Sequence, residues 1–408
     1  MTYPPMQINP EWLQDDGLQS VLETLFFGPY GASFLVGGCV RDAVAGLPCA
    51  DIDIATPHSP EKVTWLFGGR EDVKLLPTGV DHGTLTAMIG GVGYEVTTFR
   101  KDFATDGRRA TVEFAKTIQE DAMRRDFTMN ALYMDHQGWV FDPTGEGIDD
   151  LLARRVRFVG SADERCKEDY LRILRLFRFH AKYGKGPMDS SAFWAASDNK
   201  AGLSQVSGER IWAELKKLLS CHDPMDALFE MERSGVLGFI LPRHSQVQHV
   251  ADVISIERQA SAGPGWERRL VALMGYDEDD VQMPFPVSNA EQKYLTLLAQ
   301  NWDNGGRAAQ VAYKTQDTRS AYDCYVLALA ADRDIWSDPT KEIMRGRKAC
   351  MPLTASYLMQ SGLKGKALGD TLRTAEKVFI RSDLLAELDS LLDVFEVRVA
   401  LSTAQRIT

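Results

Sequence analysis

The chain has 408 residues, of which 44% are hydrophobic and 25% are charged. This is the balance of a soluble globular protein, and the length predicts about two to four domains. The formal net charge is −11, which argues against indiscriminate binding to nucleic acid, because phosphate contacts come from clustered Lys and Arg.

No apolar run approaches the roughly 20 residues that a membrane-spanning helix needs, so we exclude a membrane protein. The amino-terminal residues lack both the basic start and the apolar stretch of a signal peptide. The six cysteines include no CxxC pair, which predicts neither a disulfide framework nor a zinc site. We therefore expect a protein of the reducing cytoplasm.

The first part of the chain carries the pattern of a mixed α/β domain. Residues 34–36, 84–89 and 94–99 are short apolar runs bounded by glycine, which is typical of strands. Residues 61–67 and 120–134 have the apolar spacing of helices. The sequence therefore predicts an α/β head in the first 150 residues or so.

The remainder reads as helical from about residue 168 to the end. Residues 209–219 and 384–399 are clear amphipathic stretches. The acidic run at 276–280, followed by MPFPVS, predicts a linker between helices.

The strongest local signal is an apolar strand that runs into two glycines, FLVGGCVRD at residues 34–42, followed by DIDI at 51–54. A glycine turn before a helix lets backbone N–H groups approach a phosphate closely. The spacing of Asp51 and Asp53 puts both carboxylates on one face of a strand, with Ile52 and Ile54 toward the core. Two adjacent carboxylates repel each other, and Mg²⁺ is the cation expected to resolve that repulsion.

Glu95 is a third carboxylate, flanked by apolar residues on what reads as a neighbouring, buried strand. A glutamate on such a strand needs a partner, and a metal ion is a suitable one. An isolated Asp-x-Asp pair is a solvated turn about as often as it is a metal site, but the upstream glycines and Glu95 favour the metal site here.

This combination resembles the signature of the DNA-polymerase-beta nucleotidyltransferase superfamily. More narrowly, it resembles the class II tRNA nucleotidyltransferases, or CCA-adding enzymes, and their relatives the bacterial poly(A) polymerases. The motif wording is similar to the alphaproteobacterial and mitochondrial types. The resemblance covers residues 34–219 and implies nucleotide-binding roles for Gly37, Gly38 and Arg41.

Further motifs continue this resemblance. Residues 95–109 are similar to the family's flexible loop, in which Asp106, Arg108 and Arg109 would orient a triphosphate; an ordinary hairpin with exposed arginines is an equal alternative. RRDFTMN at 124–130 matches the family motif assigned to ribose and triphosphate, and the spacing of four places Asp126 and Asn130 on one helix face. The resemblance makes Arg125 the expected phosphate contact.

EDYLRILRLFR at residues 168–178 resembles the family's base-selecting motif. Asp169 and Arg172 lie three apart, one helical turn, and Arg175 and Arg178 continue the same ridge. A carboxylate accepts from an exocyclic amino group and a guanidinium donates to a ring acceptor, a pattern that cytosine and adenine satisfy and uracil and guanine do not. Asp169 and Arg172 would thus select CTP and ATP without a template. An amphipathic helix with a solvated arginine stripe is the alternative.

Two further segments complete the picture. SGERIWAEL at 207–215 resembles the family's last motif, to which we assign structural support rather than chemistry. Residues 341–377 carry eight Lys or Arg against three acids, so we expect Lys364 and Lys366 in this basic segment to bind RNA phosphates.

The leading hypothesis is template-independent addition and repair of the tRNA 3′-terminal CCA, with CTP and ATP as substrates. Asp51, Asp53 and Glu95 would form the catalytic centre with two Mg²⁺ ions. We expect a catalytic head at 1–150, a neck with the base-selecting motif at 151–220, a body at 221–330 and a tRNA-binding tail at 331–408. We expect no DNA partner.

Five alternatives remain at this stage, and the last in rank is a distant nucleotidyltransferase acting on antibiotics, which would share the two glycines and the Asp-x-Asp pair but not the EDxxR helix. A bacterial poly(A) polymerase shares the head. Those polymerases, however, have in common a stretch of Lys and Arg early in the head, and residues 78–83 of this chain contain no Lys or Arg. An enzyme adding CC alone would lack the flexible loop, whereas one adding the final A alone would share it. A catalytically inactive RNA-binding scaffold on this fold would not need the three carboxylates.

Overall fold

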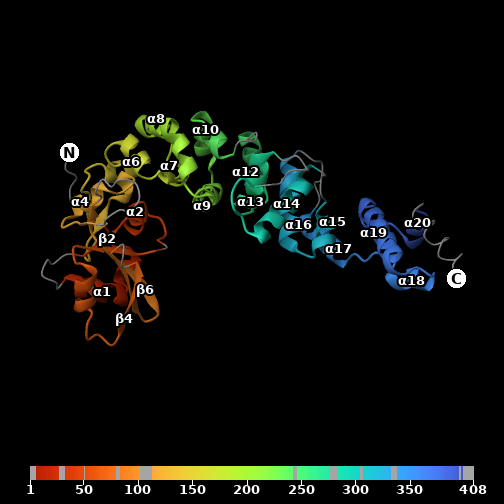
Figure 1. Cartoon of the computed structure of the whole chain (residues 1–408), viewed down its shortest axis with the longest axis horizontal. Helices are drawn as coiled ribbons and strands as arrows, with labels where there is room; N and C mark the ends of the chain where they lie inside the picture. Colours follow the sequence, from red (N-terminus) through yellow and green to blue (C-terminus); the bar gives the residue numbers. More distant parts are fainter. Residues whose placement is uncertain are drawn as a thin grey trace. The chain divides into compact units, whose positions relative to one another are not determined.

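The computed structural model describes residues 6–26, 33–49, 51–79, 83–101, 113–241, 246–275, 283–303, 307–331, 338–394 and 397. The chain forms two compact units. The first comprises residues 1–214 and 226–239, and the second comprises residues 215–225 and 240–408 (Figure 1).

The first unit contains an eight-stranded mixed sheet with the order β1-β10-β9-β2-β3-β6-β5-β4. Strands β3 and β6 run parallel, and the other neighbouring strands are antiparallel. A separate pair, β7 and β8, follows β6 in the chain. The strands are β1 (Met6–Gln7), β2 (Phe34–Val36), β3 (Asp53–Thr56), β4 (Val73–Gly79), β5 (Thr84–Ile89), β6 (Val92–Thr98), β7 (Arg100–Lys101), β8 (Glu113–Phe114), β9 (Tyr133–Met134) and β10 (Trp139–Phe141).

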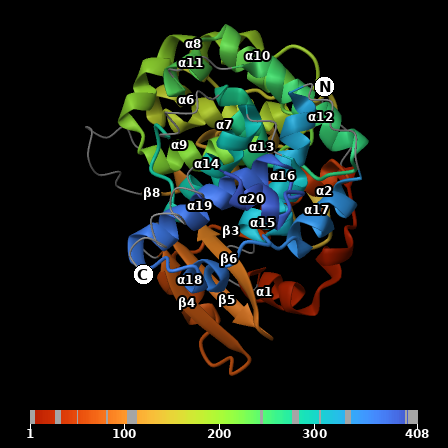
Figure 2. The same ribbon diagram turned by 90° about the vertical axis from the view of Figure 1, so that its right-hand side faces the viewer.

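Helix α1 lies beside strand β6 (Figure 2). Tyr94 and Val96 of β6 are buried, and the Tyr94 hydroxyl donates to Asp15, next to the start of α1. Because successive side chains of a strand alternate between faces, Glu95 points to the opposite face. That face carries the candidate site.

Helices make up the rest of the first unit. They are α1 (Asp16–Phe26), α2 (Gly38–Val44), α3 (Pro60–Leu66), α4 (Ile118–Met123), α5 (Gly147–Leu152), α6 (Ala162–Glu168), α7 (Leu171–Tyr183), α8 (Ser190–Asn199), α10 (Met225–Arg233) and α11 (Val236–Ile240), with short 3₁₀ turns at Glu11–Gln14 (η1), Thr128–Asn130 (η3) and Lys200–Gln205 (η4). Helix α9 (Gly208–Leu219) runs from the first unit into the second.

The described part of the second unit is helical. A buried cluster of three charged residues, Arg268 and Arg269 with Glu257, lies among its helices. The helices are α12 (Val247–Gln259), α13 (Trp266–Met274), α14 (Asn289–Asp303), α15 (Ala308–Thr315), α16 (Thr318–Ala330), α17 (Pro339–Lys348), α18 (Ala355–Gln360), α19 (Gly365–Arg381) and α20 (Leu388–Leu392). An α/β head followed by a helical remainder is therefore confirmed.

Two of the expected helices are wrong in extent. Residues 120–134 are not one helix: α4 ends at Met123, η3 follows, and β9 begins at Tyr133. The break arises because the Asp126 carboxylate accepts from the Phe127 backbone N–H, and this local bond competes with helical bonding. Within 384–399, the described helix spans Leu388–Leu392, since Asp383 and Leu384 have positive φ angles of 60° and 65°.

Candidate active site

The sheet register brings two of the three expected carboxylates together. Asp53 and Glu95 are direct partners across the parallel strands β3 and β6, so their side chains share one face. This confirms that Glu95 lies on a strand neighbouring Asp53. Glu95 is exposed, however, and not buried as we expected, because its face of β6 is open in this part of the molecule.

Asp51 lies just before β3 rather than on it, and it is exposed. Ile54 is fully buried, as the strand prediction requires, whereas Ile52 is half-buried. Within the described ranges, no three His, Cys, Asp or Glu side chains are grouped as a ready metal cage. The site thus offers a pair of strand carboxylates with a third acid at the edge.

The electrostatics of Asp53 favour a cation. Burial raises the pKa of Asp53, the negative charges of Glu95 and Asp51 raise it further, and the Arg125 guanidinium acts in the opposite direction. The net effect is a pKa above the ordinary value of an aspartate. A bound cation would remove the like-charge repulsion and keep the carboxylate ionised.

The glycine turn lies beside Arg125. Gly37 has a φ of 72° and precedes α2, a conformation that disfavours any residue with a Cβ. A Cβ on Gly37 would also lie 3.3 Å from Nη1 of Arg125. Gly38, the first residue of α2, is half-buried next to it. The lack of a side chain at Gly37 therefore leaves Nη1 of Arg125 uncrowded on this side.

Arg41, Asn130, Asp126 and Arg175 form one continuous polar network. Arg41 Nη1 donates to Asn130 Oδ1 at 2.6 Å, and Asn130 Nδ2 donates to Asp126 Oδ1 at 2.9 Å. Arg175 Nε donates to the other carboxylate oxygen of Asp126 at 2.8 Å. The expectation that Asp126 and Asn130 share a helix face is wrong, because they lie in a bend and a 3₁₀ turn, but this fold still brings their side chains into hydrogen-bonding contact.

This network has charged and aromatic supports. Burial raises the pKa of Asp126, but the charge of Arg175 and the amide of Asn130 lower it by more, so its net pKa is below the ordinary value. At the other end, the Tyr183 hydroxyl donates to Asp42 at 2.8 Å, and the Arg41 guanidinium lies 4.3 Å from the Tyr183 ring centroid. Four of the expected nucleotide-binding residues are thereby linked from α2 to α7.

The base-selecting motif folds differently from our expectation. Asp169 does not lie on α7: it ends α6 in an extended conformation, with φ −151° and ψ 104°. Its carboxylate accepts from the backbone N–H of Leu171 at 3.1 Å and from Arg210 Nη2 at 2.8 Å. Arg172 Nη1 instead donates to Glu168. Asp169 and Arg172 are therefore neighbours with separate partners.

Arg178 is also paired on the protein. Its Nε donates to Glu214 of α9, a carboxylate that is 5% exposed, and its guanidinium lies 4.4 Å from the Phe179 ring centroid. About a sixth of the Arg178 side chain remains exposed. Arg178 thus ties α7 to α9.

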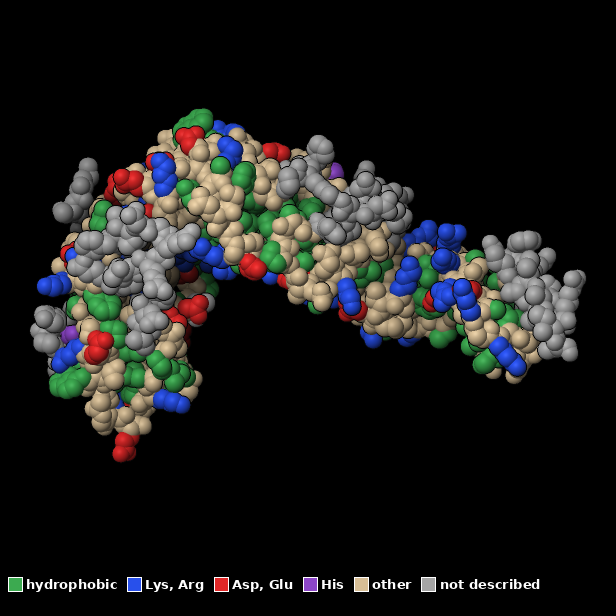
Figure 3. All heavy atoms as spheres, in the orientation of Figure 1, with side chains coloured by type: hydrophobic (Ala, Val, Ile, Leu, Met, Phe, Trp, Pro, Cys, Tyr) green, Lys and Arg blue, Asp and Glu red, His purple; other side chains and the backbone are tan. Residues whose placement is uncertain are grey.

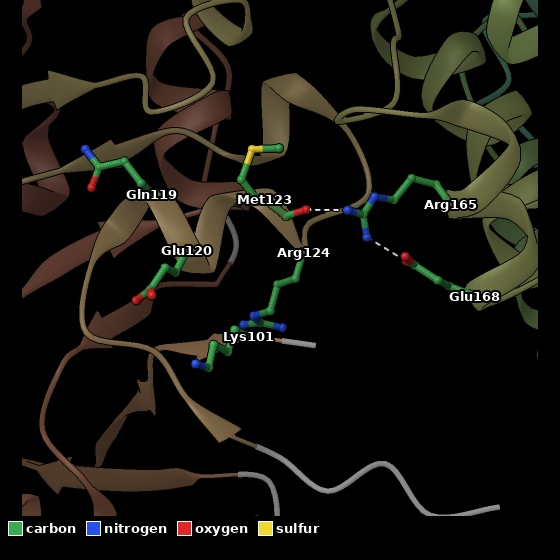
Figure 4. Close-up of a pocket in the computed structure, with 7 residues that line it drawn as sticks. All are labelled: Lys101, Gln119, Glu120, Met123, Arg124, Arg165 and Glu168. Atoms are coloured by element: carbon green, nitrogen blue, oxygen red, sulfur yellow. Dashed lines mark hydrogen bonds and ion pairs between the residues drawn. The ribbon is translucent and has the colours of Figure 1, made fainter. Parts of the chain in front are cut away.

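A pocket of about 430 Å³ lies beside these motifs (Figure 4). Arg165 donates to the Met123 carbonyl and to Glu168 across one part of it, at 2.5 and 2.6 Å. The same Glu168 carboxylate binds Arg172. The pocket is lined by Lys101, Gln119, Glu120, Met123, Arg124, Arg165 and Glu168. Its volume is within the range of small-molecule sites, about 300–1,000 Å³.

Three of the expected residues, Asp106, Arg108 and Arg109, lie outside the described residues. Lys364 and Lys366 belong to the second unit. Both side chains are exposed at the start of α19, where Lys and Arg side chains gather over α17 and α19 (Figure 3). Neither has an ion pair among the described residues.

Sequence reasoning missed several residues of this region. Asp121 and Tyr133 hold Arg125, Glu214 holds Arg178, and Arg210 holds Asp169. The acid at Asp121 lies four residues before Arg125, which is one helical turn, so that pair was detectable from spacing. Glu214 and Arg210 lie 36 and 41 residues from their partners, and no local pattern indicates those contacts.

Comparison with known proteins places the chain in a family. The family model described as "Poly A polymerase head domain" matches residues 33–157, and the model described as "Probable RNA and SrmB- binding site of polymerase A" matches residues 188–247. The mitochondrial CCA tRNA nucleotidyltransferase 1 of Mus musculus is 42% identical over 404 residues, covering 94% of this chain and 91% of that protein. The alignment with the Homo sapiens counterpart, also at 42% identity, spans 52% of this chain and 49% of that protein.

The fold agrees with this relationship. The crystal structure of the Bacillus stearothermophilus CCA-adding enzyme in complex with CTP matches with a TM-score of 0.70 at 23% identity, over 98% of this chain and 99% of that one. Across the described residues, no helix has the length and apolar character needed to cross a bilayer. The chain belongs to the family of class II CCA-adding tRNA nucleotidyltransferases.

Proposed function

We propose that this protein adds and repairs the 3′-terminal CCA of tRNA, using CTP and ATP and releasing pyrophosphate. The observation that carries the proposal is the pairing of Asp53 with Glu95 beside the Gly37 turn and Arg125. Relatives of matching length are named for this activity, among them the Mus musculus enzyme. Solved relatives of the same fold are described in complexes with CTP, with ATP and with tRNA.

The carboxylates fit Mg²⁺. This ion is bound through one or two protein carboxylates together with substrate phosphates, and it would relieve the repulsion from Glu95 and Asp51 that, together with burial, raises the pKa of Asp53. Asp51 and Asp53, with Glu95 beside them, would hold two ions, which would activate the tRNA 3′ hydroxyl and neutralise charge on the departing pyrophosphate.

The protein's own groups would then bind and orient the substrates. Arg125 points at the space beside Gly37 and would contact the triphosphate. The network of Arg41, Asn130, Asp126 and Arg175 would hold that turn and the ribose end of the site in one geometry. Positioning and charge stabilisation are what phosphoryl chemistry requires from a protein.

We propose that Asp169 and Arg172 read the base edge. For this, Asp169 gives up its ion pair with Arg210 and accepts from the amino group of cytosine or adenine. Arg172 gives up its ion pair with Glu168 and donates to the ring acceptor of the same base. Both exchanges are inexpensive, because the paired side chains are partly exposed and such ion pairs contribute about 0–1 kcal/mol.

We propose that the segment 331–408 binds the tRNA. Lys364 and Lys366 are exposed and unpaired within the described residues, and such side chains position RNA phosphates without reading bases. We also propose a reducing compartment, since all six cysteines are free thiols.

The experiment that tests the function uses three tRNA transcripts that end before CCA, after C and after CC. Each is incubated with the protein, Mg²⁺ and one labelled nucleoside triphosphate at a time. We expect CTP incorporation to stop after two residues, one ATP to follow, and UTP and GTP to remain inert. Long ATP tails on any RNA would identify a poly(A) polymerase, and a single A on the CC-ended transcript alone would identify an A-adding enzyme. No incorporation would make the protein a scaffold.

A further inference from the structure

Asp121 of α4 is a buried carboxylate next to the candidate site. It is not among the site residues that we expected from the sequence. Its side chain is 1% exposed, and both oxygens are fully engaged. Oδ2 accepts from the Tyr133 hydroxyl at 2.6 Å and from Arg125 Nη2 at 3.0 Å. Oδ1 accepts from Arg124 Nε at 2.8 Å and from the backbone N–H of Arg100 at 3.0 Å.

These contacts fix the direction of the Arg125 guanidinium. Nη2 is held by Asp121, and Nε donates to the Tyr133 hydroxyl at 3.2 Å. Nη1 has no hydrogen bond among the described residues and lies toward Gly37, 3.3 Å from where its Cβ would be. The charge of Arg125 acts on Asp53 from this position. One edge of the guanidinium is thus anchored, and the other faces the glycine turn.

The same carboxylate holds Arg124, which lines the pocket beside Glu168 (Figure 4). Burial raises the pKa of Asp121, but the charges of Arg125 and Arg124 outweigh it and bring the pKa to about 2. Asp121 is therefore ionised throughout the neutral range, and two neighbouring arginines share its charge.

We propose that Asp121 is a positioning residue for nucleotide binding, which aims Arg125 at the triphosphate of CTP and ATP. This inference rests on the proposed function. Because the triphosphate is common to both nucleotides, Asp121 acts equally on the two and has no part in base choice.

The test is a double-mutant cycle on nucleotide incorporation, made of Asp121→Asn, Arg125→Ala and the double variant. We expect Asp121→Asn to raise the KM for CTP and for ATP by the same factor, about tenfold, with kcat changed less than threefold. In the Arg125→Ala background, Asp121→Asn should add less than a further twofold increase. The proposal would be overturned if the two substitutions raised KM independently, so that their factors multiply in the double variant. A change in the ratio of the KM for CTP to the KM for ATP would also overturn it.

The matched control is Asp323→Asn in the second unit. Asp323 is also buried, at 3% exposure, and also binds an arginine, Arg268, and a tyrosine, Tyr294. We expect Asp323→Asn to lower the thermal midpoint and leave both KM values unchanged. An equal rise in KM for this variant would mean that any lost buried carboxylate has the effect, and the proposal would fail.

Tyr133→Phe is the second variant, for use if Asp121→Asn does not fold. It removes one anchor from both Asp121 and Arg125, and we expect about a threefold rise in KM for CTP and ATP alike; no rise would overturn the proposal. The wild-type protein is assayed first on the three tRNA transcripts. Inactive wild type contradicts the proposed function, whereas active wild type with unchanged KM in the variants contradicts this inference alone.

Discussion

Replacing Arg175 by alanine tests whether this arginine stabilises the buried Asp126 carboxylate of the candidate site. Arg175 supplies both partners of Asp126 Oδ2, through Nε and Nη2, whereas Oδ1 is held by Asn130 and the Phe127 backbone N–H. Arg175→Ala therefore leaves half of a buried carboxylate without partners, since Asp126 is 9% exposed.

The expected penalty follows from the burial of the pair. Removing one partner of a fully buried ion pair costs about 3–5 kcal/mol. About a third of the Arg175 side chain is exposed, so water can reach the vacated position, and we expect about 2 kcal/mol. For a unit of this size, that lowers the thermal midpoint by about 4–8 °C.

The penalty should depend on pH in a defined direction. In the wild type the pKa of Asp126 is below its ordinary value, so its stabilising contribution is present above the unfolded pKa and lost as the pH falls through the folded one. Without Arg175, burial dominates and the pKa rises, so the variant takes up a proton at a higher pH. The difference in stability between wild type and variant should therefore be largest near pH 7–8 and shrink below about pH 5.

The assay is thermal unfolding of both proteins between about pH 4 and 8, repeated in an Asp126→Asn background. There Arg175→Ala should cost less, because no buried charge is left unpaired. A penalty that stays constant with pH, or that persists in the Asp126→Asn background, would refute this reasoning.

Three further variants test the other assignments. Asp53→Asn should reduce incorporation of both CTP and ATP by roughly three orders of magnitude in single-turnover assays, since a metal-binding carboxylate is lost; full activity would contradict the catalytic assignment. Arg210→Ala should leave the thermal midpoint within about 1 °C, because its pair with Asp169 is exposed, and should leave the preference for CTP and ATP over UTP and GTP within about threefold, because Asp169 gives up Arg210 when it reads the base; a larger loss of that preference would contradict the exchange. Reversing the charge of Lys364 and Lys366 to Glu should weaken tRNA binding and reduce the slope of log affinity against log salt by about 1 for each lysine that contacts a phosphate; an unchanged slope would place the RNA on another surface.

The sequence predicted the parts of this site that depend on strand geometry. The apolar run before Gly37 predicted a strand, and the apolar neighbours of Glu95 predicted a second strand next to that of Asp53; both are confirmed. Asp169 was misplaced because a spacing of three fits one continuous helix as well as two helices joined at the aspartate. What decides between them is that the Asp169 carboxylate accepts from the Leu171 backbone N–H, a choice that residue spacing does not record.

The partners of the arginines could not be predicted for a different reason. Arg178 with Glu214 and Arg175 with Asp126 are 36 and 49 residues apart, so they depend on how α7 packs against α9 and η3. Such contacts arise from tertiary packing, in which many acids of this chain could serve equally well as partners. Local spacing therefore identifies the arginines and leaves their carboxylates open.

These pairings explain how a chain with a net charge of −11 can handle polyanionic substrates. Among the described residues, each arginine that we expect near the nucleotide already has an acidic or amide partner on the protein: Arg41 with Asp42 and Asn130, Arg125 with Asp121, Arg172 with Glu168, Arg175 with Asp126 and Arg178 with Glu214. The acids reduce the attraction of the site for phosphate in general, but they also hold the guanidinium groups in place before a nucleotide arrives. A ligand gains from such a site when its phosphates meet the unpaired edges, because less side-chain entropy is then lost on binding. Acidic residues at this site therefore favour selectivity for a correctly placed triphosphate over indiscriminate affinity for nucleic acid.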